Sequence, residues 1–188
     1  EYLLEGFARI AGEYPDATLV LAGGGTLYDE MRQRADDLGL GGRVIMPGPV
    51  DREEAPVYFR TADIFVVPSV KHESGAVDGL PVVIPEAMAA GLPIIASDAG
   101  GIPLLVRDGC NGILVPQRNP GAIADALRRL LKDRELCRKY GEKGRNIVEC
   151  SVNYDAVAGH FTLLYRAIAG HVPLLDMPSF RIVEERAE

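Results

Sequence analysis

Short hydrophobic runs alternate with longer amphipathic segments along most of this chain. Five such runs occupy residues 18–22, 43–46, 64–67, 94–96 and 112–115. The run at 64–67 is continuous and contains β-branched residues, which is typical of a strand buried on both faces. Because helical segments separate the five runs, we expect an α/β protein with a parallel sheet.

Apolar residues at helical spacing predict the elements between these runs. Thr26 and Asp51 are suitable N-caps, and Gly39 is a suitable helix end. Asn119 is a further N-cap and stands before Pro120, which fits the first position of a helix. We expect the helices after Asn119 to close the sheet. The predicted helices span residues 2–13, 26–38, 51–60, 83–90, 119–131, 134–149 and 153–169, with a single helical turn at 102–106.

The stretch from Asp63 to Gly101 has the most informative order of elements. The strand at 64–67 is followed by a polar, glycine-containing loop at 71–79, a helix that Gly91 ends, the strand at 94–96 and a Gly-Gly turn at 100–101. A loop after a strand lies at the carboxyl edge of a parallel sheet, where open α/β sheets bind ligands. We therefore expect a ligand site in this stretch.

The beginning of the helix in this stretch is suited to a phosphate. Pro81 can take an early helical position, and Pro85 is tolerated only if the helix begins near Val82 or Val83. The N–H groups at that end have no partners within the helix, and such groups bind phosphate without a cationic side chain.

Two carboxylates, Asp78 and Glu86, flank this helix start with seven residues between them. Glu86 can accept hydrogen bonds from both hydroxyls of a ribose, and Asp78 can accept one from a sugar hydroxyl. The alternative is that both acids only stabilise the helix through its dipole, by about 0.3–1 kcal/mol each. The spacing by itself leaves both interpretations open.

A glycine triplet at 23–25 lies between a predicted strand and a predicted helix. Its backbone N–H groups could approach a phosphate, but the triplet does not complete a G-x-G-x-x-G motif. No lysine accompanies it, so a P-loop is excluded as well. A tight strand-to-helix turn is the simpler interpretation.

Composition limits the classes of function. The 188 residues carry a net charge of −7, which argues against a generic nucleic-acid or anionic-membrane surface. No apolar run approaches the roughly 20 residues that span a bilayer. The three cysteines are odd in number and lack metal-site spacing, so we expect structural thiols, no metal site and a cytoplasmic location.

The two ends of the chain carry expectations of their own. Residues 2–10 already follow a helical pattern, so we expect the chain to be a fragment, with residues 1–170 forming one domain and 171–188 a tail. The basic run at residues 128–134 predicts a solvated helix face, with contact at the inner membrane surface as the alternative. Apolar faces left without a partner could also support a homodimer of the fragment.

Several motifs in order resemble the C-terminal domain of family-4 retaining glycosyltransferases of the GT-B fold. The similarity covers about residues 1–168. The motifs are LVLAGGGTLYDEMRQRADDLGL, RVIMPGPVD, YFRTADIFVVPS, the run from Asp78 to Glu86, AMAAGLPIIAS, GGIPLLV, DGCNGILVP and NPGAIADAL. The resemblance implies a Rossmann-like, three-layer α/β/α domain with a parallel sheet that binds a nucleotide-sugar donor.

The family's motif of two glutamates with seven residues between them implies roles for this stretch. Glu86 matches the glutamate that holds the ribose hydroxyls, and Asp78 matches the glutamate that contacts the donor hexose. Val50, after Gly48, matches a position that meets the base. The residues that match the backbone around the diphosphate are Gly79, Leu80, Pro81, Val82 and Val83.

The resemblance also implies a reaction, a metal-independent hexosyl transfer with retention from a UDP-, GDP- or ADP-sugar to an unidentified glycan or lipid acceptor. Asp78 would orient the hexose, although it is one methylene shorter than the family's glutamate; Glu73 in the same loop is a possible substitute. The family's Arg and Lys, which neutralise the diphosphate, and its N-terminal domain lie before the segment matching Glu1. We therefore expect the isolated chain to be inactive and to bind nucleotide weakly.

Two other classes of function remain open. One is a nucleotide- or partner-binding module of the same fold without chemistry, in which Asp78 marks the loss of transfer. The other is a different GT-B enzyme, such as a nucleotide-sugar epimerase, which the ordered motifs disfavour. His72 is a candidate donor or acceptor contact, whereas His160 and His171 are expected to be surface or packing residues.

Overall fold

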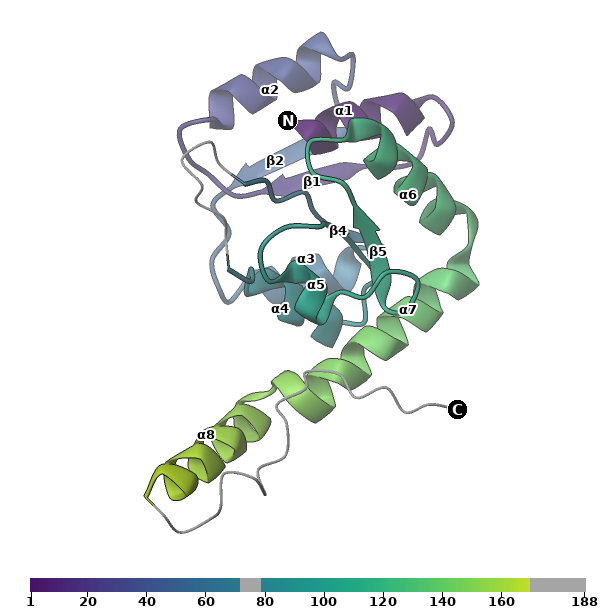
Figure 1. Cartoon of the computed structure of the whole chain (residues 1–188). Coiled ribbons are helices and arrows are strands. Elements are labelled where there is room, and N and C mark those ends of the chain that lie inside the picture. The colour runs from purple at the N-terminus through teal and green to yellow at the C-terminus, as the bar shows by residue number, and fades with distance from the viewer. Residues whose placement is uncertain (72–78, 170–188) are drawn as a thin grey trace.

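All five predicted strands form, and they lie in two parallel sheets (Figure 1). The computed structural model describes residues 1–71 and 79–169. The first sheet pairs β1 with β2, and the second has the order β3-β4-β5. The strands are β1 (Leu19–Ala22), β2 (Val44–Gly48), β3 (Phe65–Val67), β4 (Ile94–Ser97) and β5 (Gly112–Val115).

Helices separate the strands as the hydrophobic pattern predicts. The described part of the chain ends with three long helices, the last of which extends away from the sheets (Figure 1). A short π-helical segment, Val148–Val152, joins the last two. The helices are α1 (Tyr2–Ala11), α2 (Tyr28–Asp37), α3 (Ala55–Thr61), α4 (Val83–Ala89), α5 (Ile102–Leu105), α6 (Pro120–Lys132), α7 (Arg134–Ile147) and α8 (Tyr154–Ile168).

Two hydrophobic clusters cover the two faces of the β3-β4-β5 sheet. In β4, Ile95 belongs to the cluster that includes α1 and α6, whereas Ile94 and Ala96 belong to the cluster that includes α4 and α5. This alternation follows from the two-residue period of a strand. All four residues of β4 are buried, as expected for a central strand with helices on both faces. The result is the Rossmann-like, three-layer arrangement.

Several predicted helix ends are confirmed. The Asn119 carboxamide oxygen accepts the N–H of Ala122 at 2.9 Å, and Pro120 takes the first position of α6. Gly39 follows α2 with a φ of 69°, and Gly91 follows α4 with a φ of 81°. Both glycines therefore adopt the left-handed conformation that commonly ends a helix.

Two predicted N-caps are wrong. α2 begins at Tyr28 and its N-cap is Leu27, so Thr26 lies before the helix. α3 begins at Ala55 with Glu54 as its N-cap, because Asp51 starts a separate turn in which its carbonyl oxygen accepts the N–H groups of Glu54 and Ala55. Cap residues also favour turns, and here the turn prevails.

The basic run on α6 and α7 makes contacts within the molecule as well as facing solvent. Arg128 pairs with Glu13, just after α1, at 2.7 Å and is about one-third exposed. The Arg129 guanidinium donates to the Tyr140 hydroxyl at 3.4 Å. This run therefore helps to hold α6 against its neighbours. None of the helices in residues 1–71 and 79–169 is long and apolar enough to cross a membrane.

Candidate functional site

The loops at the carboxyl edge of the β3-β4-β5 sheet are tied together by one side chain. The Gln117 carboxamide oxygen accepts the N–H of Lys71, after β3, at 2.7 Å. Its nitrogen donates to the carbonyl oxygen of Asp98, after β4, at 2.8 Å. Arg118 adds a bond from its guanidinium to the carbonyl oxygen of Lys71 at 3.0 Å. Residues that follow β5 therefore stabilise the loops at the edge where the sequence predicts a ligand.

The segment that leads into α4 rests on the glycine pair after β4. The N–H of Gly101 donates to the carbonyl oxygen of Gly79. A Cβ at Gly101 would lie 2.6 Å from that same oxygen, so a side chain there would force the backbones apart. The predicted Gly-Gly turn thus has a specific role, since it lets the two loops approach closely.

The start of α4 agrees with the prediction made from Pro85. The helix begins at Val83 after Val82, and Pro85 falls within the first turn. Pro81 lies just before the helix, and its carbonyl oxygen accepts the N–H of Ile84 at 3.1 Å. Val82 is 75% exposed, so this end of the helix faces solvent.

A groove of about 940 Å³ separates the two sheets and reaches the start of α4. We call it the central groove. Its lining includes all of β1 and β3, and three of the predicted site residues: Val50, Val83 and Glu86. Val50 follows β2 and Glu86 lies in α4, so residues 36 positions apart in the sequence meet at one cavity. Glu86 is exposed, which leaves its carboxylate accessible.

The remaining predicted residues lie beside the groove or outside the described part of the chain. Gly48 is buried, with a φ of 85°, and its carbonyl oxygen accepts the N–H of Gly23 at 2.8 Å. Leu80 packs into the cluster on the α4 face, and Gly79, Pro81 and Val82 precede α4. Asp78, together with His72, Glu73, His171 and the tail at 171–188, lies outside the described residues.

The glycine triplet connects β1 to the segment before α2. Gly23 and Gly24 line the central groove, and a Cβ at Gly24 would lie 2.9 Å from the ring of Pro49. Gly23 and Gly25 have φ values of 141° and 133°, which side chains rarely adopt. These conformations account for two of the glycines by backbone geometry.

The first turn of α1 also lies near this edge. The pKa of the Tyr2 phenol is raised, first by a hydrogen bond with Glu1, then by burial, while the positive charge of Arg118 opposes the rise. Arg118 follows β5, so this interaction brings the start of α1 close to the carboxyl edge. Glu1 lines the central groove.

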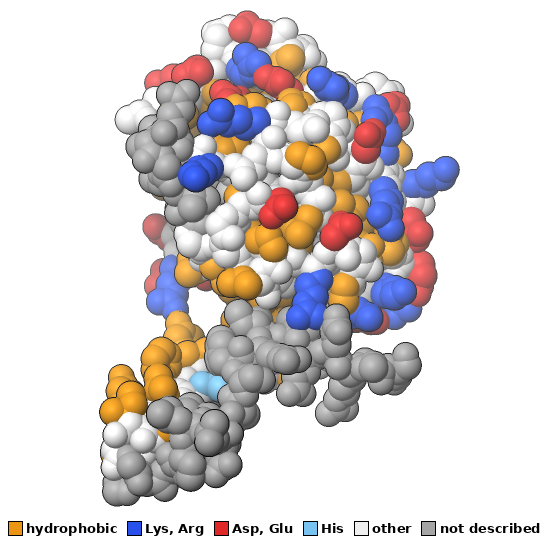
Figure 2. All heavy atoms as spheres, in the orientation of Figure 1, with side chains coloured by type: hydrophobic (Ala, Val, Ile, Leu, Met, Phe, Trp, Pro, Cys, Tyr) orange, Lys and Arg blue, Asp and Glu red, His pale blue; other side chains and the backbone are white. Residues whose placement is uncertain are grey.

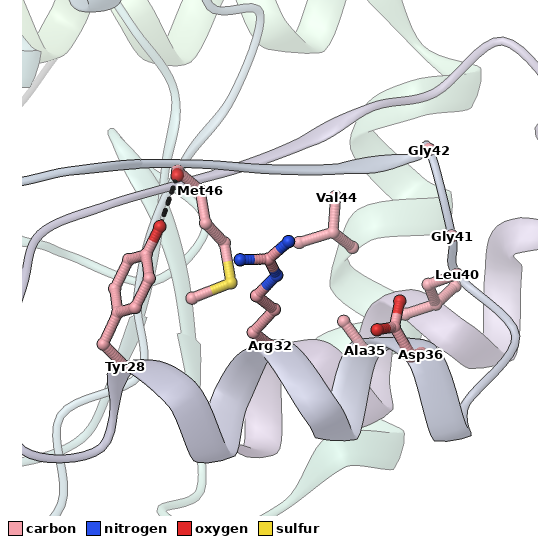
Figure 3. Close-up of a pocket in the computed structure, with 9 residues that line it drawn as sticks. All are labelled: Tyr28, Arg32, Ala35, Asp36, Leu40, Gly41, Gly42, Val44 and Met46. Carbon is pink, nitrogen blue, oxygen red and sulfur yellow. Dashed lines mark hydrogen bonds between the residues drawn. The ribbon is translucent and has the colours of Figure 1, made fainter.

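A smaller hollow of about 370 Å³ lies between α2 and β2 (Figure 3). The Tyr28 hydroxyl donates to the carbonyl oxygen of Met46 at 2.7 Å, and Arg32 points between Met46 and Val44. None of the predicted site residues lines this hollow. In the described part of the chain, no group of three or more His, Cys, Asp or Glu residues is placed to hold a metal ion.

Three residues shape this edge of the sheet although the sequence does not predict a role for them: Gln117, Arg118 and Gly101. The sequence predicts a turn at the glycine pair, but it does not indicate that this turn contacts Gly79. Nothing in the local pattern distinguishes Gln117 from other polar residues that follow a strand.

Comparison with known proteins identifies relatives over most of the chain. The family model of glycosyl transferases group 1 matches residues 1–147. A GDP-mannose-dependent alpha-(1-6)-phosphatidylinositol monomannoside mannosyltransferase from Mycobacterium tuberculosis is 36% identical over 143 residues. That match covers 76% of this chain and 37% of the relative, so this chain spans well under half of the relative's length.

Two solved structures are similar in fold and sequence. The C-terminal domain of a glycosyl transferase group 1 family protein, LpcC, from Francisella tularensis has a TM-score of 0.70 and 29% identity, covering 81% of this chain and 78% of that one. HepE from Anabaena, solved with UDP and glucose, has a TM-score of 0.72 and 25% identity, covering 89% of this chain and 44% of that one.

Proposed function

Because the chain belongs to the family of glycosyl transferases group 1, we propose that it is the donor-binding half of a retaining hexosyltransferase of the GT-B fold. The family and the fold are those expected from the ordered motifs. The donor is a nucleotide diphosphate sugar. It binds where the central groove reaches the start of α4.

The observation that carries this proposal is the convergence of Val50, Val83 and Glu86 on the central groove. Glu86 is exposed on α4 and can accept hydrogen bonds from both ribose hydroxyls, one at each carboxylate oxygen. Val50 supplies an apolar contact for the base from the other side of the groove. The backbone from Gly79 to Val83 meets the diphosphate between them.

Glycosyl transfer at this site needs electrostatic support for the departing diphosphate. The bond between the anomeric carbon and the phosphate oxygen breaks, an acceptor oxygen bonds to that carbon on the same face, and the acceptor proton passes to the phosphate. Asp78 orients the hexose during this step. In the family, an Arg and a Lys just before the segment matching Glu1 stabilise the leaving group, which is a large contribution to catalysis. The isolated chain therefore binds the donor without turning it over.

Different observations bear on the base, the hexose and the acceptor of the proposed reaction. The mycobacterial relative is named for GDP-mannose, and HepE was solved with UDP. These relatives make UDP and GDP the first nucleotides to test here, with ADP as the third. The acceptor, a glycan or a lipid, is bound by the other half of the intact protein.

The sequence at Asp78 favours a second candidate function, a nucleotide- or partner-binding module without transfer. A carboxylate shortened by one methylene sits about an ångström farther from the sugar, and a misplacement of this size can cost about a hundredfold in rate. Asp78→Glu in the full-length protein separates the two: it raises transfer in a weakened enzyme and has no effect in a module that lacks the rest of the machinery.

Calorimetric titration of the 188-residue chain with UDP, GDP and ADP tests the donor site. One nucleotide is expected to bind more tightly than the other two. Glu86→Gln keeps the shape of the side chain and removes its charge. Hydrogen bonds to charged groups contribute about 1.5–3 kcal/mol, so this variant should weaken binding by about tenfold to a hundredfold.

Glu142→Gln is the matched control, because Glu142 lies on α7 and pairs with Arg138 outside the groove. This variant should bind nucleotide as the parent chain does. Equal binding by the parent chain and by Glu86→Gln would refute the assigned ribose contact. Failure of all three nucleotides to bind, in the full-length protein as well, would refute the donor site.

A further inference from the structure

Two consecutive residues after β5 hold the backbone of Lys71 at both of its polar groups. The Gln117 carboxamide oxygen accepts the N–H of Lys71 at 2.7 Å, and the Arg118 guanidinium donates to the carbonyl oxygen of Lys71 at 3.0 Å. Lys71 follows β3, so these bonds join segments that are 46 and 47 positions apart in the sequence. We call Gln117 and Arg118 the clamp.

The clamp also holds the loop after β4. The Gln117 carboxamide nitrogen donates to the carbonyl oxygen of Asp98 at 2.8 Å. The N–H of Asp98 donates to the carbonyl oxygen of Val115 at 2.9 Å, so the backbone of Asp98 is bonded on both sides as well. One carboxamide therefore fixes the spacing between the loops that follow β3 and β4.

Arg118 has an unfavourable backbone conformation. Its φ is 55°, and it is the only non-glycine residue with a positive φ in the part of the chain that the structure describes. Glycine adopts this region routinely, whereas a Cβ makes it costly. Such conformations persist where the surrounding structure holds them, and they cluster at functional sites. The conformation therefore points to a role for the Arg118 side chain, which is bonded to Lys71.

The order of the strands places the clamp near the sugar end of the proposed donor site. Val50, the proposed base contact, follows β2, and the backbone proposed for the diphosphate leads into α4, after β3. β1 and β3 line the central groove, and beyond β3 the sheet continues to β4 and β5. A donor that lies along the carboxyl edge from Val50 to α4 therefore directs its hexose toward the loops that the clamp holds. Neither clamp residue lines the central groove, where Val50 and Glu86 lie.

Charged side chains stand on the loops that the clamp holds. Lys71 and Asp98 are both exposed, and neither takes part in an ion pair within residues 1–71 and 79–169. An ammonium group donates hydrogen bonds and a carboxylate accepts them, so the two together match sugar hydroxyls, which do both. Gly79, before α4, joins the same region because its carbonyl oxygen accepts the N–H of Gly101.

We propose that the clamp positions the hexose of the donor. Gln117 and Arg118 hold the loops after β3 and β4 at the spacing at which Lys71 and Asp98 meet the sugar hydroxyls. Both clamp residues are positioning residues, since they act through the backbone of these loops and not through a contact with the donor. This inference rests on the proposed donor-binding function and extends it to the sugar end of the site.

Calorimetry on the full-length protein tests the clamp with three pairs of ligands: UDP and UDP-glucose, GDP and GDP-mannose, ADP and ADP-glucose. The readout, in the pair that binds best, is the dissociation constant of the nucleotide sugar divided by that of the nucleoside diphosphate. Gln117→Ala removes both carboxamide bonds, so this ratio should rise by about threefold to tenfold. The constant for the nucleoside diphosphate should stay within about twofold of the parent value, because the clamp lies apart from the nucleotide contacts.

Arg118→Gly separates positioning from stability. Glycine adopts a φ of 55° without steric cost, so relief of the backbone should offset the lost bond to Lys71. The urea concentration at the unfolding midpoint should therefore stay close to the parent value. The ratio of dissociation constants should still rise, by about threefold, because the guanidinium bond is gone. A residue that only stabilised the fold would not give this combination.

Gln33→Ala is the matched control, because Gln33 is exposed on α2 and its carboxamide donates to Asp37 on the same helix. This variant should leave both dissociation constants as in the parent protein. Equal weakening of both ligands by Gln117→Ala would show a merely structural role and overturn the inference. A ratio that stays at the parent value in Gln117→Ala and Arg118→Gly would overturn it as well.

Glu86→Gln distinguishes this inference from the donor site itself. The ribose is common to both ligands of a pair, so this variant should weaken both alike and leave their ratio unchanged. If no nucleoside diphosphate binds the parent protein, the donor site is refuted and the clamp's role with it. If the nucleotides bind and Glu86→Gln weakens them, an unchanged ratio in the clamp variants overturns the clamp's role alone.

Discussion

Cys137 and Cys150 lie on consecutive helical segments and differ in their surroundings. Burial is the main reason that the pKa of the Cys137 thiol is raised, with Asp133 and Asp63 adding to the rise. Its sulfur also donates to the carbonyl oxygen of Leu130 at 3.1 Å. Cys150 is exposed. These surroundings agree with a structural role for Cys137.

The two thiols should therefore react at different rates. The thiolate is the reactive form, and a raised pKa lowers its fraction at any given pH below that pKa. At pH 8, iodoacetamide should modify Cys150 well before Cys137, and the rate at Cys137 should keep rising at higher pH. Peptide mass spectrometry over time measures both. Faster modification of Cys137 than of Cys150 in the folded protein would contradict this account.

Glu86 and Val50 show what could be predicted at the level of single residues. The family resemblance predicts that both contact the donor, and this contact stays a prediction. The fold brings both to one groove because loops after parallel strands share an edge. Gln117 could not be predicted, since its two bonds join loops that are 46 and 19 positions away. Thr26 and Asp51 were predicted as caps from residue type alone, and local turn geometry decided otherwise.

Among the elements, α4 and α7 pack together where glycines bring their backbones close. A Cβ at Gly141 in α7 would overlap the carbonyl oxygen of Gly91, just after α4. Arg145, one turn later, donates to the carbonyl oxygens of Ala89 and Ala90 at 3.1 and 3.0 Å. α7 thus holds the far end of the helix that carries Glu86.

Gly141→Ala should disrupt this contact. Overpacking of a close contact costs about 1–3 kcal/mol and occasionally more. The free energy of unfolding of the variant should therefore fall by about 1 kcal/mol or more. Gly159→Ala is the control, because Gly159 lies in α8 with open space around it, and alanine there should stabilise the helix by about 0.5–1 kcal/mol. Urea unfolding measures both variants. Stabilisation by Gly141→Ala would show that α7 does not lie against Gly91.

The order of the elements was predictable because strands and helices differ in hydrophobic period. Each predicted strand forms within two residues of its expected bounds. Strand pairing could not be predicted in the same way, since it depends on contacts between distant segments. The pattern predicts five parallel strands, but it does not indicate that β1 and β3 would stand apart across a groove.

On the scale of the whole molecule, α8 carries an exposed apolar face. Figure 2 shows hydrophobic side chains gathered where α8 extends from the rest of the protein. Tyr154, Tyr165 and Ile168 are 88%, 66% and 70% exposed. Contiguous exposed apolar surface often marks a contact with another protein surface. The predicted homodimer of the fragment stays a prediction, as does the division at residue 170.

The central groove gives the molecule two regions with different chemistry. Between the strands it is lined by apolar side chains and backbone edges, and at its end it carries the exposed Glu86 carboxylate. The proposed donor site depends on a contact between Glu86 and the ribose, and this contact can be measured by itself.

A double-mutant cycle between Glu86 and the ribose tests the central claim most directly. The nucleotide that binds best is titrated into the parent chain and into Glu86→Gln, each with the ribo form and the 2′-deoxy form. If Glu86 accepts the 2′-hydroxyl, removing either partner weakens binding, and removing both costs less than the sum of the single losses, with a coupling of about 1 kcal/mol or more. Additive losses would show that Glu86 and the ribose do not touch, and would contradict the assigned donor site.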